Sequence, residues 1–128
     1  MERNAVARVA AVNMLAFRVA YGAALLVAPG KVAGNRWLGA GARQPAATVG
    51  LRGVGGREVA LHGLALLRVL WGQPLRSLLF ASAAGDLVDV AATALARDGI
   101  PDHSAALTAA VAGGSAALTL AIAASLDE

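Results

Sequence analysis

Long apolar stretches alternate with short polar breaks along this chain. Proline and glycine mark the breaks, at Pro29-Gly30, Pro45, Gly72-Gln73-Pro74 and Gly99-Ile100-Pro101. They leave four apolar segments, at about residues 5–28, 46–71, 75–97 and 103–126. Each segment has close to the ~20 residues that cross a ~30 Å hydrocarbon core as a helix. The pattern predicts an all-α protein, a four-transmembrane-helix antiparallel bundle in which residues 1–128 form a single domain.

The composition favours an integral membrane protein over a soluble helical bundle. Hydrophobic residues make up 58% of the chain and charged residues 15%, whereas a soluble domain carries about a quarter charged residues. A soluble bundle would need a polar face on every helix, and the last segment has no acidic or basic residue between His103 and Asp127. The arginines are scattered and the aromatic residues are few, so no nucleic-acid partner is expected.

Ionisable residues nevertheless lie well inside the apolar segments. A charge at the bilayer centre costs at least ~2.5 kcal/mol, so such residues normally face the bundle interior and pair with one another. Their positions along the helices, at ~1.5 Å per residue, bring them to one layer near the bilayer centre. Three arginines match three carboxylates, so the expected net charge with a neutral histidine is zero. The set is Arg18, Arg52, Arg57, Glu58, His62, Asp86 and Asp89.

The third segment carries the pair with the clearest chemistry. Asp86 and Asp89 are three residues apart and therefore share a helix face, which Ser82 and Thr93 extend. Two carboxylates this close repel as like charges, which favours one protonated acid beside one charged base. Such a pair suits acid–base chemistry on a lipophilic small molecule or lipid. We therefore expect an isomerase, a cyclase or an epoxide-opening enzyme that uses no cofactor and no metal.

The second segment is expected to support this pair. Glu58 and His62 are four residues apart and can touch, whereas Arg57 projects away from His62 and is expected to contact a different helix than Glu58 does. Arg57 and Arg18 would stabilise developing charge on the substrate. The predicted catalytic residues are Asp86, Asp89, Arg57, Arg18, Glu58 and His62.

Further polar residues are expected to bind the substrate. They are Tyr21, Arg52, Ser82, Thr93 and Ser115. Tyr21, Arg52 and Asp89 are displaced toward the side of the membrane that holds residues 29–45. The site is therefore expected to open toward that side.

Two other functions fit the same buried charges. Membrane-embedded carboxylates and histidines also relay protons, so a proton-linked small transporter is one alternative, and a chain this short would then be expected to form a homodimer. A non-catalytic membrane subunit is the other, with the charges acting as a salt-bridge network that sets helix register. Substitution of Asp86 or Asp89 distinguishes the three functions. It would abolish turnover in an enzyme, proton-linked flux in a transporter, and assembly alone in a non-catalytic subunit.

Glycines in two of the segments predict close packing between helices, because a glycine in a membrane helix lets a neighbouring backbone approach. They are Gly50, Gly53, Gly55, Gly56, Gly63, Gly113 and Gly114.

Four short motifs resemble a known pattern. They are YGAALLVAP at residues 21–29, WLG at 37–39, GGREVALHG at 55–63 and GDLVDV at 85–90. Together with Arg18 they resemble the DoxX-like group and related uncharacterised families of small bacterial four-helix membrane proteins. The resemblance covers most of residues 18–97 and implies a bundle in the bacterial cytoplasmic membrane, with no settled activity. It points to Arg18, Arg57, Glu58, Asp86 and Asp89 as the site residues.

Overall fold

The computed structural model describes residues 2–128, and this part of the chain is helical without strands. Four helices are long: α1 (Glu2–Val27), α3 (Pro45–Leu70), α4 (Arg76–Leu95) and α5 (Ser104–Ser125). Three are short: α2 (Pro29–Gly34), η1 (Gly39–Arg43) and η2 (Arg97–Gly99). The prediction of an all-α protein is confirmed, and the long helices begin and end within a few residues of the four apolar segments.

Proline and glycine lie at the ends of the long helices, as the sequence predicts. Pro45 occupies the first turn of α3, where its missing N–H costs no helical hydrogen bond. After α3 the chain turns at Gly72, whose φ of +66° lies in the left-handed region that favours glycine. Pro74 then follows in the linker to α4.

The connection between α1 and α3 is folded rather than a plain loop. α2 and η1 occupy it, and their apolar residues Ala33 and Ala42 pack against Leu25 of α1 and Leu51 of α3. Tyr21, Val32, Trp37, Leu38 and Val54 are partly buried against this cluster. We call it the α2 cluster; it forms one end of the molecule.

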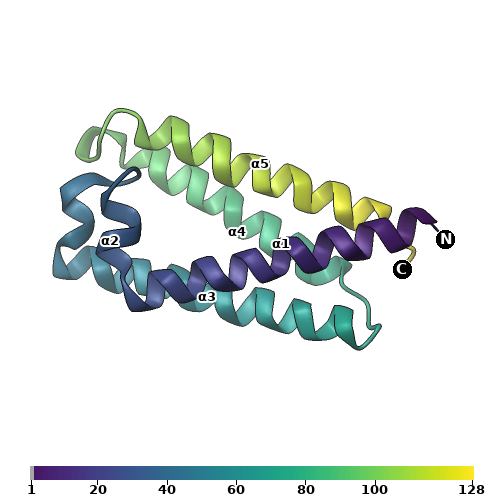
Figure 1. Ribbon diagram of the computed structural model, residues 1–128. Coiled ribbons are helices and arrows are strands. Elements are labelled where there is room, and N and C mark those ends of the chain that lie inside the picture. The colour runs from purple at the N-terminus through teal and green to yellow at the C-terminus, as the bar shows by residue number, and fades with distance from the viewer. Residues whose placement is uncertain (1) are drawn as a thin grey trace.

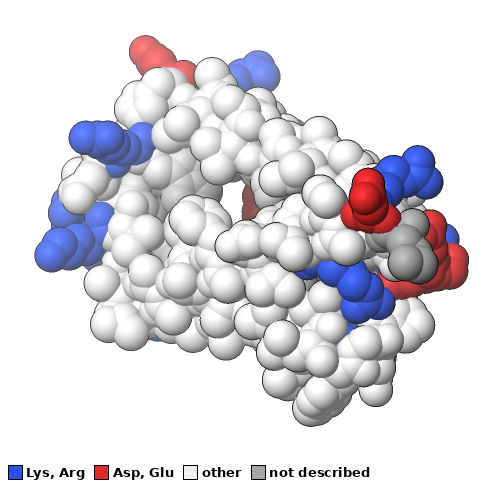
Figure 2. All heavy atoms as spheres, turned by 45° about the vertical axis from the view of Figure 1, so that its right-hand side comes forward, with Lys and Arg blue, Asp and Glu red and all other residues white. Residues whose placement is uncertain are grey.

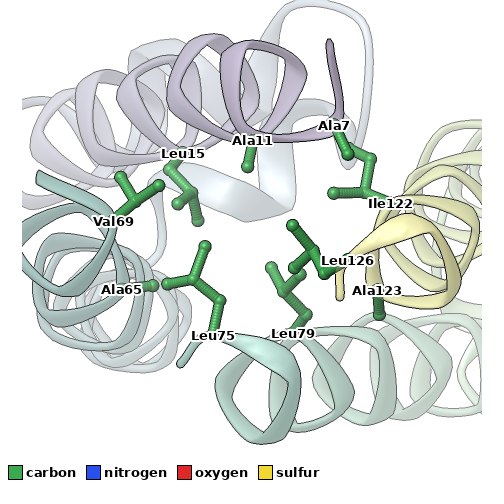
Figure 3. Close-up of a cluster of buried hydrophobic side chains, with 10 residues drawn as sticks. All are labelled: Ala7, Ala11, Leu15, Ala65, Val69, Leu75, Leu79, Ile122, Ala123 and Leu126. Carbon is green, nitrogen blue, oxygen red and sulfur yellow. The ribbon is translucent and has the colours of Figure 1, made fainter. Parts of the chain in front are cut away.

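The long helices lie side by side, with the two chain termini at the end opposite α2 (Figure 1). α1 packs mainly against α3, and α4 packs mainly against α5. Near the termini, apolar side chains from all four helices point toward one another (Figure 3). This second cluster, the terminal cluster, consists of Ala7, Ala11, Leu15, Ala65, Val69, Leu75, Leu79, Ile122, Ala123 and Leu126.

Close helix packing depends on one of the predicted glycines and on one that was not predicted. A Cβ atom on Gly55 would lie 2.7 Å from the Gly22 carbonyl oxygen, and a Cβ on Gly22 would lie 2.6 Å from the Glu58 Cβ. α1 and α3 therefore cross with their backbones in contact at this point. Gly50, Gly53, Gly56, Gly63, Gly113 and Gly114 have open space beside them, so the prediction was wrong for these positions.

The surface of the helices is apolar over much of their length. Large hydrophobic side chains are exposed on every long helix, among them Phe17, Leu64, Leu87 and Val111. Figure 2 shows a broad uncharged surface, with most Lys, Arg, Asp and Glu side chains toward the two ends of the molecule. α1, α4 and α5 are each long and apolar enough to cross a membrane. α3 is the exception, and it is the long helix that carries Arg52, Arg57, Glu58 and Arg68.

Candidate functional site

Arg18, on α1, lies at the centre of a buried ion-pair network. Its Nε and Nη2 donate to the two carboxylate oxygens of Glu58 on α3, at 2.8 and 2.9 Å. Its Nη1 and Nη2 donate to the two oxygens of Asp86 on α4, at 2.7 and 2.5 Å. Nη1 also donates to Ser115 on α5, at 2.8 Å. These bonds employ all five N–H donors of a guanidinium, so Arg18 joins the four long helices and has no donor left for a substrate.

Arg57 forms the second centre of the network. It donates to both oxygens of Asp89 on α4, at 3.2 and 2.6 Å, and more weakly to Glu58 at 3.4 Å. The expectation that Arg57 contacts a different helix than Glu58 does agrees with this geometry, because Glu58 is paired with Arg18 on α1. Asp86 and Asp89 thus each have their own arginine. Each carboxylate therefore faces an arginine, whereas the expectation of an acid beside a base rested on the two carboxylates facing each other.

His62 is buried behind Glu58, and its ring contacts Glu58 and Ser82. The ring is 1% exposed. Its Nδ1 lies 2.9 Å from the Glu58 carbonyl oxygen and 3.4 Å from the Glu58 carboxylate, and its Nε2 lies 2.7 Å from the Ser82 hydroxyl. A carbonyl only accepts, so Nδ1 is the donor, and a neutral ring then accepts the Ser82 proton at Nε2. Ser82 therefore binds His62, not a substrate.

Two residues predicted to bind the substrate lie outside the site. Arg52 is exposed and donates to the Leu26 carbonyl at 3.1 Å. It lies five residues from Arg57, about 140° around the helix, so the two side chains cannot face the same space. Thr93 donates to the Asp89 carbonyl at 2.7 Å, one turn back on its own helix. Both substrate-binding assignments are at odds with this geometry.

Because Arg52 is not part of the network, the network's net charge differs from the one expected. Two arginines, Arg18 and Arg57, face three carboxylates. With a neutral His62 the network carries one net negative charge, not the zero that was expected from the sequence. The carboxylates are Glu58, Asp86 and Asp89.

A cavity of about 700 Å³ lies beside the network. Its polar lining includes Arg18, Tyr21, Glu58, Asp86, Asp89, Thr108 and Ser115, and its apolar walls include Met14, Phe17, Leu107, Val111 and Leu118. Of the predicted site residues, Arg57, His62, Ser82, Arg52 and Thr93 do not line it. The structure therefore brings together the residues of α1, α3, α4 and α5 that share the same depth, as the sequence predicts, but only part of them contacts the cavity.

The cavity opens sideways between α1 and α5. Exposed Phe17 on α1 and exposed Val111 and Leu118 on α5 line it. In Figure 2 the molecule is hollowed, and an acidic surface is visible at the bottom of the hollow. The expected opening toward the α2 side is wrong, because Val32 and Trp37 of the folded α1–α3 connection close that end.

Sequence reasoning did not assign Trp37, Asn13 and Thr108 to the site. The Trp37 indole donates to the Thr108 hydroxyl at 2.7 Å, which ties the α1–α3 connection to α5 beside the cavity. Thr108 and Ser115 are seven residues apart and share a helix face, and this spacing was the available signal. Trp37 gave none, since its position depends on the fold of the connection.

Among residues 2–128, no three His, Asp or Glu side chains converge as metal ligands would. No protein-family model, curated protein or solved structure matches the chain. The resemblance to the DoxX-like group therefore stays a prediction.

Proposed function

We propose that this chain is an integral protein of the bacterial cytoplasmic membrane in which all four long helices cross the bilayer, and that it isomerises a lipophilic small molecule without a cofactor. The observation that carries the proposal is the cavity, which has apolar walls, a floor of ionised side chains and an opening toward the surrounding lipid.

The proposal that α3 also crosses the bilayer is supported by the pairing of its charged side chains. Glu58 and His62 are buried and paired, and Arg57 is paired with Asp89 across the interface with α4. Charges held in this way no longer oppose insertion as isolated charges would. Exposed Leu64, Leu67 and Leu70 cover the outer face of the same helix.

The cavity suits a lipophilic ligand. About 700 Å³ lies within the range of small-molecule sites. A lateral opening lets a molecule enter from the bilayer without crossing water. The cavity also touches the terminal cluster through Ala10 and Met14 and the α2 cluster through Tyr21 and Trp37, so apolar packing closes both ends. This closure favours an enzyme over a transporter.

Asp89 is the best-placed base. Asp86 is 2% exposed and both its oxygens accept from Arg18. The Asp89 side chain is 24% exposed, lines the cavity and is bound by Arg57 alone. Arg57 holds the carboxylate in one orientation while leaving it open to a substrate. Arg18, Glu58 and His62 are then positioning residues.

Isomerisation is the member of the acid–base class that this geometry favours. Acid-initiated cyclisation and acid-catalysed epoxide opening need an acid at the first step, whereas a proton shift between two carbons can begin with proton removal by a base. Each aspartate accepts hydrogen bonds from an arginine, a geometry that suits a base. Asp89 would take a proton from one carbon of the substrate and return it to another, with no net consumption of protons. Tyr21 lines the same cavity and would donate a hydrogen bond to the substrate.

Deuterium exchange tests this reaction before the substrate is known. Purified protein in detergent is incubated in D₂O with a chloroform–methanol extract of the membranes from which it was purified. Mass spectrometry then follows carbon-bound deuterium. We expect a lipophilic species to gain deuterium with the wild-type protein, and Asp89→Asn to slow this at least about 100-fold.

Asp98→Asn is the matched control, since it removes one carboxylate from an exposed position in η2. It should exchange at the wild-type rate. Exchange that is equal in the Asp89→Asn protein, or no exchange above the protein-free extract, would contradict the proposal and favour a structural salt-bridge network.

A further inference from the structure

The ion-pair network has one more carboxylate than it has arginines, and all three carboxylates line the cavity. Arg18 is fully engaged by Glu58, Asp86 and Ser115. Arg57 divides its Nη2 between Asp89 and Glu58. Asp89 is the carboxylate of the three with the largest exposed fraction, and it lines the cavity. Asp89 is therefore the most accessible carboxylate of a network that carries one net negative charge.

No described side chain supplies the missing charge from nearby. Arg52, which the sequence places in the same layer, is exposed and bound to the Leu26 carbonyl. His62 lies behind Glu58, away from the cavity, and its contacts with the Glu58 carbonyl and Ser82 satisfy a neutral ring. A net charge buried in an apolar protein is costly until a partner neutralises it.

We propose that the cavity selects a lipophilic molecule that carries one positive charge on nitrogen. Its cationic group would lie against Asp89, beside Tyr21. Its apolar body would lie between Phe17 and Leu118, toward the opening. The inference rests on the proposed function, whose substrate class it names. It also gives the unusual charge count of the network a role, because the bound complex becomes neutral.

The single net negative charge of the network also suits proton removal from such a substrate. In the complex, the negative network and the positive substrate sum to zero. When the nitrogen belongs to a β,γ-unsaturated iminium group, the C–H bond on the carbon next to C=N⁺ breaks and its proton forms an O–H bond on Asp89. The C–H electron pair forms a C=C bond while the C=N⁺ π pair moves to nitrogen, so the substrate becomes a neutral dienamine and the network also becomes neutral. Return of the proton to a different carbon restores both charges. A neutral substrate that formed an anionic intermediate, such as an enolate, would instead leave one uncompensated negative charge in the cavity throughout the reaction.

Lipophilic aryl probes that differ in charge test the selectivity. Tetraphenylphosphonium, tetraphenylborate and neutral triphenylphosphine oxide are titrated into the purified protein in a non-ionic detergent, with calorimetric detection. The part of the binding that Leu118→Trp removes is the cavity component; Leu120→Trp, an exposed position on the same helix outside the cavity, is its control. We expect the phosphonium to bind in the cavity at least about tenfold more tightly than either other probe.

Asp89→Asn should bring the affinities of the three probes within about threefold of one another, and Asp98→Asn should leave the preference intact. Asn13→Lys covers the case in which Asp89→Asn does not fold. Asn13 is exposed at the cavity rim, so a lysine there adds a positive charge without breaking an ion pair, and it should also remove the preference.

Two results would overturn the inference. If the neutral or anionic probe occupies the cavity as tightly as the phosphonium, the network is already neutral, with His62 as its third cation. If Leu118→Trp affects no probe, these cations do not occupy the cavity. Deuterium exchange judges the proposed isomerisation separately, because it uses the extract and none of these probes.

Discussion

At the scale of single residues, the network is asymmetric in how its two arginines are used. Arg18 is buried, and each of its N–H groups donates to Glu58, Asp86 or Ser115. Arg57 is a third exposed and holds Asp89 at the edge of the cavity. Arg18 therefore serves mainly to hold the helices, and Arg57 serves mainly to orient one carboxylate. The sequence presents the two as equivalent intramembrane arginines.

Substitution of Arg18 should be strongly destabilising. Arg18→Gln leaves Glu58 and Asp86 as buried charges without their main partner, which costs roughly 3–5 kcal/mol. Arg18→Lys should recover only part of this, since an ammonium cannot form the same set of bonds. Unfolding of the purified protein in detergent, followed by circular dichroism, measures both.

The matched control is Arg52→Gln, which removes an exposed arginine with a single carbonyl contact. Its cost should stay below about 1 kcal/mol. Equal losses for the two positions would mean that Arg18 contributes no more than a surface charge.

At the scale of helices, the molecule consists of two close pairs joined at a seam. α1 packs mainly against α3 and α4 packs mainly against α5. The ion pairs Arg18–Asp86 and Arg57–Asp89 both cross from the first pair to the second, as does the Arg18–Ser115 bond. Charged contacts thus join the pairs where apolar packing is looser, and the cavity lies along the same seam.

The crossing of α1 and α3 depends on the absence of side chains at two glycines. Gly22→Ala would place a Cβ 2.7 Å from the Gly55 carbonyl oxygen, so the helices must separate and the protein should lose about 1–3 kcal/mol of stability. Unfolding in detergent measures this loss.

Gly53→Ala is the control, because a Cβ there meets nothing within 4 Å. It should be neutral or stabilising by up to about 1 kcal/mol, as alanine is the better helix former. A stable Gly22→Ala protein with unchanged Arg18 contacts would show that the backbones do not touch.

At the scale of the whole molecule, the arrangement predicts a membrane topology. The four proposed spans would place both termini, together with the α3–α4 connection, on one side, and α2, η1 and η2 on the other, as the ends of the molecule in Figure 1 are divided. The chain has no cysteine, so single cysteines can report on each side.

Gln73→Cys and Asp127→Cys should react with an impermeant maleimide from one side of sealed vesicles, and Gln44→Cys and Asp98→Cys from the other. If the Gln44→Cys and Gln73→Cys proteins are labelled from the same side, α3 does not cross the membrane, even if α1, α4 and α5 do.

Much of the fold follows from local pattern. Helix positions were predictable because proline, glycine and apolar length act within a segment, and the depth of the polar layer followed from the rise per residue. The folded connection with α2 and η1 was missed, since its helices are short and depend on packing against Leu25 and Leu51.

The sequence by itself determined which residues share one layer of the protein: Arg18, Arg57, Glu58 and Asp86 meet at the depth expected. Only the tertiary structure decided how each helix is turned about its axis, and hence that Arg52 faces outward, that the network keeps a negative charge and that the cavity opens between α1 and α5. Depth is a property of one helix and is counted along the chain. Rotation is set by contacts between helices, above all the Gly22–Gly55 crossing, and no local pattern contains it.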